Sequence, residues 1–421
     1  MGKGILTVGK LVLTNTVSNQ DAYDRLRVSN PITVYENLST GTGAKNPLLI
    51  DEITAGSGVA TANDNSYIAM AAPTSGGRVV RQSKPYIVYK PGTSKITLCT
   101  GVFNDNGGTV GLRSRIGPFD DVDDQVTNPQ GGDGYFFELE GTTMGIVYRT
   151  ASSGAQIDTR IVQSDWNFDT FDGSGPSRIT ITTWDDAFLL IFDQQWLGVG
   201  QVRIGLIIEG IIYYAHIFTN GGLKFPYTRT AKLPIRYEIE NVSAGASVDE
   251  MRMMCQSSLM EAQPSSLYPQ FVWNASQPIP VGTDVAVLSL RLKSTSNRVT
   301  LRLVDIAVLA SAGGGDPAPV NVILNPTLGG ATYANDPSPD SAAELDTAST
   351  TAITDGTTVA CGWMHPLGAL IRLSLTGGGN RSPWLDINSN IAGTSDILTI
   401  AVTRQVVSSS IGICLTWIEI S

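Results

Sequence analysis

The densest apolar run of the sequence, FLLIFDQQWLGVGQVRIGLIIEGIIYYAHIF, occupies residues 188–218. Asp193, Arg203 and Glu209 divide it into pieces shorter than the roughly 20 apolar residues that a membrane-spanning helix needs. β-branched and aromatic residues flank the dipeptide Glu209-Gly210, and glycine readily takes the positive φ of a tight two-residue turn. The run therefore predicts a β-hairpin.

The position of the turn predicts which side chains share a face of this hairpin, because side chains alternate between faces along a strand. One face is wholly apolar and the other is mixed. The apolar pairs are Ile208 with Ile211, Leu206 with Tyr213, Ile204 with Ala215 and Val202 with Ile217, and the mixed pairs are Ile207 with Ile212, Gly205 with Tyr214 and Arg203 with His216. Such a ribbon is typical of a central strand pair in a β-sandwich, and we expect the first domain to be built around it.

The composition indicates a folded, turn-rich chain. An apolar fraction of 42% with 16% charged residues is typical of folded domains, and the 44 glycines and 21 prolines leave little room for long helices. A length of 421 residues predicts two or three domains. The formal net charge of −10 disfavours binding to nucleic acid, because phosphate contacts need clustered Lys and Arg.

Targeting, redox and cofactor signals are weak. The N-terminal stretch MGKGILTVGKLVL is broken by glycine and lysine, and it predicts neither a signal peptide nor a membrane anchor. No glycine-rich loop follows a strand and opens a helix, so no nucleotide cofactor is expected. The four cysteines, Cys99, Cys255, Cys361 and Cys414, form no C-x-x-C pair, and we expect buried reduced thiols rather than disulfides or a zinc site.

The spacing of strand and turn signals predicts an all-β protein with three parts. Residues 1–60 carry only short apolar patches and are expected to form an extended N-terminal docking arm, in which Arg25, Leu26, Arg27 and Val28 are candidate interaction residues on an amphipathic strand. Residues 61–263 are expected to form a first β-sandwich, lectin-like or jelly-roll, and residues 264–421 a second β-sandwich.

Two segments carry more specific expectations. Residues 286–292 and 299–303 alternate apolar and polar side chains on either side of a polar turn, which predicts a hairpin with one buried face. Residues 251–262 fit a helix through Met251, Met254, Cys255 and Leu259, and fit a strand through Met251, Met253 and Cys255. The pattern alone leaves both open.

Candidate catalytic residues are few. The only histidines are His216 and His365; His216 is expected opposite Arg203, and His365 follows no nucleophile-elbow motif, so a hydrolytic triad is disfavoured. Glu138 and Glu140 point the same way on a predicted strand, about 7 Å apart, a spacing that glycosidases can use. Outward glutamates beside an inward Leu139 give the same pattern without function, and we favour that interpretation.

Two groups are candidate binding residues. Asp120, Asp121, Asp123 and Asp124 offer oxygen ligands for calcium, although they lack the spacing of a calcium loop and a solvated acidic loop is the favoured alternative. Trp166, Trp184 and Trp196, with Phe168, offer aromatic faces for a glycan, although such residues more often cap a core.

Several segments in combination resemble a family of virion structural proteins of tailed bacteriophages and some large DNA viruses. They are DAYDRLRVSNPITVYE, YFFELEGTTMGIVYR, QSDWNFDTFDGSGPS, DQQWLGVGQVRIGLIIEG and LPIRYEIEN in the first part of the chain, and VNVILNPTLGG, GTSDILTIAV and LTWIEIS in the second. The resemblance covers most of the chain and includes no catalytic signature. It implies a non-enzymatic capsid-decoration, fibre or tail component, and it favours a strand at residues 251–262.

Together these signals predict a virion surface protein, made in the host cytoplasm, that self-associates as a homotrimer and docks on other virion proteins through its arm. No cofactor, nucleic-acid or membrane partner is expected. The alternative is a lectin-like module that binds host-surface glycans in adsorption, and the third hypothesis is a glycoside hydrolase that uses Glu138 and Glu140.

Overall fold

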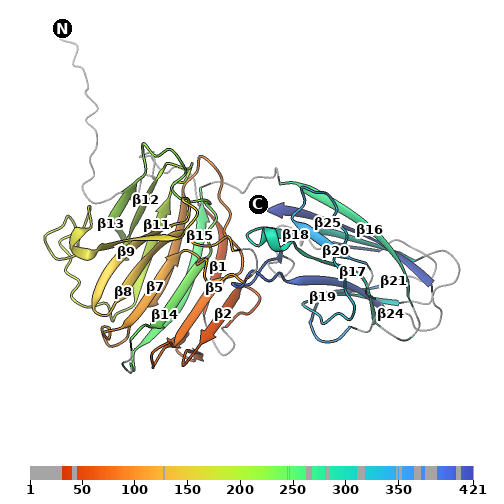
Figure 1. Ribbon diagram of the computed structural model, residues 1–421, viewed down its shortest axis with the longest axis horizontal. Helices are drawn as coiled ribbons and strands as arrows, with labels where there is room; N and C mark the ends of the chain where they lie inside the picture. The colour runs from red at the N-terminus through yellow and green to blue at the C-terminus, as the bar shows by residue number, and fades with distance from the viewer. Residues whose placement is uncertain are drawn as a thin grey trace, which may run out of the picture.

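The computed structural model confirms the predicted fold class: the chain is all-β, with two sandwich domains (Figure 1). It describes residues 31–39, 45–126, 129–243, 245, 247–261, 268–279, 282, 284–310, 318–347, 349, 353–364, 371–374, 386–403 and 409–420. Within these ranges the only helical elements are the 3-10 turns η2 (Gln163–Asp165) and η3 (Ser294–Ser296), and no helix is long and apolar enough to cross a membrane.

The first domain packs two antiparallel sheets face to face. Among the described residues, one sheet has eight strands: β13 (Ile211–Thr219), β12 (Gln201–Ile208), β11 (Phe188–Gln194), β6 (Lys95–Val102), β15 (Glu250–Met260), β4 (Tyr67–Ala71) and β3 (Val59–Asn63) in that order, with β1 (Ile32–Leu38) paired to β15. The other has seven: β10 (Ile157–Val162), β9 (Thr143–Thr150), β8 (Gly134–Glu140), β7 (Leu112–Pro118), β14 (Ile235–Asn241), β5 (Arg78–Ser83) and β2 (Ile50–Ala55). The segment 251–262, open between helix and strand, therefore contains a strand over most of its length.

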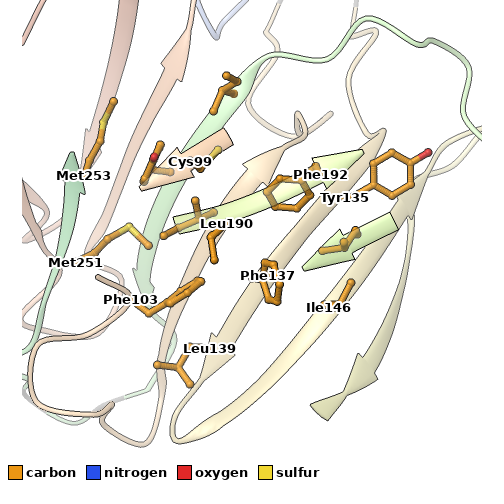
Figure 2. Close-up of a cluster of buried hydrophobic side chains, with 14 of the residues drawn as sticks. Cys99, Phe103, Tyr135, Phe137, Leu139, Ile146, Leu190, Phe192, Met251 and Met253 are labelled. Atoms are coloured by element: carbon orange, nitrogen blue, oxygen red, sulfur yellow. The ribbon is translucent and has the colours of Figure 1, made fainter. Parts of the chain in front are cut away.

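The core of the first domain lies between these sheets. Alternation along β8 sends Tyr135, Phe137 and Leu139 inward, where they are fully buried. Phe137 meets Phe192 of β11 with ring centroids 5.9 Å apart, and Figure 2 shows this contact with Leu190 beside it. The sandwich closes because each sheet turns one apolar face to the other.

The predicted hairpin forms β12 and β13, and its register is correct for half its length. Ile208 pairs with Ile211 and Leu206 with Tyr213, as expected, across a turn in which Glu209 and Gly210 both have positive φ. Beyond Gly205 and Tyr214 the register shifts by one residue. The later pairs are Ile204 with His216, Arg203 with Ile217 and Val202 with Phe218. The pair is also not central, because β13 is the edge strand of its sheet.

The shift is a β-bulge, and Gly205 explains how it fits. A Cβ atom built at Gly205 would clash with the carbonyl oxygen of Tyr213, so the two backbones approach each other where a side chain would not fit. The extra residue lies on β13, between Tyr214 and His216. The prediction assumed an unbroken ladder and missed this shift.

The second domain packs two five-stranded sheets, counted over the described residues. One contains β16 (Gln270–Ile279), β25 (Ser409–Ile420), β18 (Thr300–Ala310), β22 (Ile371–Ser374) and β23 (Asp386–Ile387). The other contains β20 (Ala343–Asp346), β17 (Asp284–Leu292), β24 (Ile397–Thr403), β19 (Ala318–Leu324) and β21 (Thr357–Met364). The change from the first pair of sheets to the second falls between Met260 and Gln270.

The hairpin expected at residues 286–303 is wrong. β17 and β18 both alternate as predicted, but they belong to opposite sheets, and the η3 turn carries the chain from one layer to the other. Leu290 of β17 and Leu303 of β18 are both buried in the core between the layers. Alternation specifies a buried face, and it does not specify the neighbouring strand.

The arm expected at residues 1–60 also needs correction. β1 and β2 lie inside that segment, and both pair with strands of the first domain. Leu48, just before β2, packs against the core of the second domain. Residues 1–30 lie outside the described part of the chain, and with them the candidate interaction residues Arg25, Leu26, Arg27 and Val28.

The two domains lie side by side in Figure 1, and ion pairs connect them; we call these contacts the joint. Arg298, between η3 and β18, reaches the first domain and pairs with Asp120 at 2.6 Å and with Asp133 at 3.4 Å. Lys84, after β5, pairs with Asp396 of the second domain at 3.1 Å. Both aspartates that meet Arg298 are buried, so these contacts hold one domain against the other.

Candidate functional site

Two of the three tryptophans expected to contact a glycan are buried in the core. Trp166 is 5% exposed and Trp184 is 3% exposed, so neither ring offers a face to a ligand. Each indole N–H is used internally: Trp166 donates to the carbonyl of Ile161, and Trp184 donates to the side chain of Gln163. Both residues belong to the first core, in agreement with the alternative interpretation that these tryptophans cap a core. Trp196 is only partly buried.

The aspartates proposed as calcium ligands instead form ion pairs with arginines. Asp121 pairs with Arg149 at 2.8 Å, and Asp124 lies between Arg78 and Arg236. Asp120 is paired with Arg298 across the joint, and only Asp123 is exposed. Among the described residues no group of acidic, His and Cys side chains is arranged to hold a metal ion. The run is thus neither a calcium loop nor a solvated loop.

These ion pairs lie on the outer face of the seven-stranded sheet. At its centre Glu238 of β14 is 1% exposed and is held by Arg115 and Arg236. Burial opposes the charge on Glu238, but Arg236, Arg115 and Arg78 outweigh burial and hold the pKa of Glu238 well below its usual range. The carboxylates here are fixed as counter-ions.

Glu138 is held in the same network and is not poised for glycoside hydrolysis. Its two carboxylate oxygens meet different arginines, Arg115 at 2.8 Å and Arg160 at 2.8 Å, and the side chain is buried. Its proposed partner Glu140 is exposed and lies 4.0 Å from Arg160. A general acid must present its carboxyl group to the leaving group, and both carboxylate oxygens of Glu138 are held by arginines instead.

His216 has a structural role. Burial lowers the pKa of His216 to about 4, and Nδ1 accepts a hydrogen bond from the backbone N–H of Asn167 at 3.2 Å. The residue across the ladder from His216 is Ile204 and not the expected Arg203. Burial, and not a neighbouring cation, therefore disfavours the charged imidazole. His365 lies outside the described residues.

The described cysteines are free thiols, but they are not all buried. Cys99 is buried in the first core, while Cys361 is exposed on β21. The expectation of uniformly buried thiols is therefore wrong for Cys361.

A shallow depression of about 420 Å³ remains as the candidate binding site. It lies where β11 ends, β12 begins and β13 ends, at the edge of the eight-stranded sheet. Its lining consists of neutral side chains and glycines: Gln195, Leu197, Val199, Gly200, Gln201, Thr219, Asn220 and Gly221. Leu197 and Val199 are 47% and 46% exposed, so both offer apolar surface within this lining.

The loop of residues 195–200 is held in a fixed shape by backbone contacts. Leu197 and Gly198 both have positive φ, and the N–H of Gly200 donates to the carbonyl of Trp196 at 2.8 Å. A Cβ atom at Gly200 would clash with the carbonyl of Gln195, so glycine is required there. The depression is therefore preformed by the turn itself.

Trp196 anchors this loop. Its indole N–H donates to the hydroxyl of Thr228 at 2.9 Å, and its ring meets the edge of Tyr89 with centroids 6.3 Å apart. Its backbone N–H donates to the hydroxyl of Tyr89 at 3.2 Å. Of the three predicted tryptophans this one lies beside the depression, where it supports the wall.

The opposite wall belongs to the loop that follows β13. Asn220 donates from Nδ2 to the carbonyl of Gly200 at 2.7 Å and so ties the two loops together. The loop continues through Leu223 and Phe225, which are 50% and 73% exposed. Both side chains lie in the loop that continues from Asn220 and Gly221 of the lining, and both are open to solvent.

Sequence reasoning missed the amide residues of this site. Gln195, Gln201 and Asn220 carry no catalytic signature, and only the loop geometry brings them together. One signal was present: the segment NGGLKFP follows a strand and sets two large apolar residues among turn formers.

Comparisons with known proteins give no family. No family model matches the chain, and no curated protein matches it. Among solved structures, the carbohydrate recognition domain of Emp47p aligns at 11% identity and a TM-score of 0.35, covering 54% of this chain and 96% of that one. An endo-1,3-beta-glucanase from Streptomyces sioyaensis aligns at 9% identity and a TM-score of 0.36, covering 55% and 96%.

A legume lectin-like domain from Entamoeba histolytica aligns at 10% identity and a TM-score of 0.31, covering 55% of this chain and 98% of that one. All three likenesses cover about half of the chain. Likenesses at such identities and TM-scores do not indicate what this protein binds.

Proposed function

We propose that the first domain binds a neutral saccharide in the depression between residues 195–201 and 219–221. The observation that carries this proposal is the lining, where side-chain amides and a hydroxyl stand beside exposed Leu197 and Val199. A sugar ring presents hydroxyl groups around its rim and C–H groups on its faces. Amides both donate and accept hydrogen bonds, and an apolar platform receives the ring face.

The same lining favours binding over catalysis. None of the residues around the depression is a carboxylate, an imidazole, a lysine or a thiol, so the depression supplies no general acid, base or nucleophile. The buried carboxylates on the other sheet are held by arginines. We therefore propose a binding module without enzymatic activity.

A glycan array with matched variants tests this proposal. Val199→Asp places a charge in the neutral lining, and Val110→Asp makes the same change at a valine that is 84% exposed at the other end of the sandwich. We expect selective binding by the wild type, loss of at least tenfold with Val199→Asp, and no loss with Val110→Asp. Equal signals for Val199→Asp and the wild type on every glycan would contradict the proposal.

A second observation supports a contact with another protein as a further role. Val110 and Val248 are 84% and 89% exposed, and Val242 is 50% exposed. Their loops lie together: the N–H of Val242 donates to the carbonyl of Gly111 at 2.8 Å, and Thr109 donates to Asp249 at 2.7 Å. We call these three valines the valine patch. Exposed aliphatic residues that gather in this way are typical of protein contacts.

We infer that the valine patch docks on another virion protein, in keeping with the resemblance of the sequence to virion structural proteins. Incorporation into purified particles, measured by mass spectrometry and by antibody-gold labelling, tests this role. We expect Val110→Asp with Val248→Asp to abolish incorporation and Val199→Asp to leave it intact. Full incorporation of the double variant, or a wild-type chain absent from particles, would contradict it.

A further inference from the structure

Two lysines at one end of the first core lack a counter-charge. Lys95 of β6 is 1% exposed, and its ammonium donates to the carbonyl of Ala231 at 2.7 Å. The Nζ atom of Lys232 is buried and meets no hydrogen-bond acceptor. Across the described part of the chain, no ion pair includes either lysine. The two are close enough for Lys232 to disfavour the charge on Lys95.

The surroundings of this pair are polar but uncharged. Gln194 of β11 pairs directly with Lys95 across the ladder and points to the same side of the sheet. It is 3% exposed and lies beside the hydroxyl of Tyr227, but neither of its amide atoms meets a partner in hydrogen-bonding geometry. Tyr135, also buried, contacts Tyr227 with ring centroids 6.1 Å apart. Figure 2 shows Tyr135 beyond Phe137 and Leu139, at one end of the inward-facing side chains of β8.

Two buried ammonium groups close together are unfavourable, and their charge can be relieved in two ways. Either the amines release their protons, or an anion enters and balances them. Burial, with Lys232 as a second cause, lowers the pKa of Lys95 to about 7, and burial lowers the pKa of Lys232 to about 8. As pH falls through this range both groups gain charge, and an anion that accepts their hydrogen bonds balances that charge.

We propose that Lys95, Lys232 and Gln194 form a binding site for a small inorganic oxyanion such as sulfate. One oxyanion accepts hydrogen bonds from the Lys232 ammonium group and the Gln194 amide, which both lack partners, and from a second N–H of Lys95, whose ammonium group already donates to Ala231. Lys232 is the partly exposed member, so the anion enters on its side. The site is separate from the saccharide depression and does not depend on it.

Thermal unfolding of the full chain in sodium sulfate tests the site, with sodium chloride at matched ionic strength as the reference. At pH 6.5 we expect sulfate to raise the Tm of the wild type in a saturable manner, because it binds the folded state alone. General exclusion of sulfate from protein surfaces raises Tm without saturation and in every variant equally. The saturable part should vanish in Lys232→Met and persist in Lys224→Met, which removes an exposed lysine. Identical responses of wild type and Lys232→Met would overturn the proposal.

Lysine acetylation footprinting of the wild type gives an answer that does not depend on how the variant folds. At pH 7 we expect sulfate to slow the acetylation of Lys232 at least threefold, because the anion covers the amine and keeps it protonated. Lys224, exposed on the loop after β13, serves as the internal reference and should react at the same rate with and without sulfate. Unchanged reactivity of Lys232 over the sulfate titration would refute an anion at this position.

Discussion

Lys95 shows how burial, more than sequence position, decides the chemistry of a side chain. Its strand alternates as any amphipathic strand does, and the sequence places Lys95 only at the end of an apolar run. In the fold the ammonium group lies between two sheets, where burial lowers its pKa to about 7. Nothing in the local sequence indicates that position, because it depends on where the segment around Ala231 crosses the end of the sandwich.

The pKa of Lys95 predicts the direction in which stability changes with pH. The unfolded chain holds the Lys95 proton up to about pH 10.5, whereas the folded chain releases it near pH 7. The unfolded state therefore binds more protons in this window, and the free energy of unfolding rises as pH rises through it. In chloride buffer we expect a gain on the order of 2 kcal/mol between pH 6.5 and 9.5.

Urea unfolding at both pH values measures this gain in the wild type and in Lys95→Met. The variant lacks the titrating group, so its gain should be clearly smaller. Lys224→Met, at an exposed lysine, should keep the wild-type gain. A variant at Lys95 with an undiminished pH dependence would show that the amine does not titrate in this range.

At the scale of elements, the turn between β12 and β13 is where prediction and structure agree best. Glu209 has φ of 52° and Gly210 has φ of 80°, which is the signature of a type I′ turn. The sequence identified the glycine because few other residues adopt such a backbone. It did not reveal that Glu209 takes the same conformation, which a glutamate adopts only at some cost.

Two substitutions in this turn should change stability in opposite directions. Glu209→Asn supplies the residue that type I′ turns prefer at their first central position, and we expect a gain of about 0.5 kcal/mol. Gly210→Ala forces a Cβ atom into positive φ, and we expect a loss of about 1 kcal/mol. Urea unfolding of both variants measures the two effects. Effects of equal sign would show that the turn has another conformation.

Other elements show what alternation cannot predict. The all-β class and the two sandwiches follow from apolar patterns in the chain, whereas the pattern left residues 251–262 open between helix and strand and only the resemblance favoured the strand found at residues 250–260. The separation of β17 from β18 does not follow from such patterns, because both strands face one core from opposite layers. The candidate site is harder still. Gln195 and Asn220 line the same depression because the chain bends at Leu197 and Gly198, and the apolar pattern does not predict such a bend.

For the whole molecule, the joint between the domains is the feature that the sequence concealed most completely. The sequence predicts that Arg298 lies in a turn between two strands and that Asp120 lies in a solvated acidic loop. In the fold they form one ion pair across the two domains. Burial opposes the charge on Asp120, but Arg298 and the backbone N–H groups of Gly132 and Asp133 outweigh burial and lower its pKa.

Removing Arg298 should loosen the molecule at this joint. Arg298→Ala leaves Asp120, 1% exposed, without its cation, and we expect a loss of about 3 kcal/mol, typical of breaking a buried pair. Small-angle X-ray scattering should show a larger radius of gyration, and calorimetry should resolve two unfolding transitions. Arg291→Ala removes a partly exposed pair with Glu344 inside the second domain and is the matched control, with a loss of at most about 1 kcal/mol. A compact, single-transition Arg298→Ala variant would contradict a fixed joint.

The measurement that tests the central claim most directly is isothermal titration of the full chain with the oligosaccharide that the array selects. We expect saturable binding with one site per chain, weakened at least tenfold by Val199→Asp in the depression and unchanged by Val110→Asp in the valine patch. Binding that survives Val199→Asp at full strength, or no saturable heat with any oligosaccharide, would contradict a saccharide site between these loops.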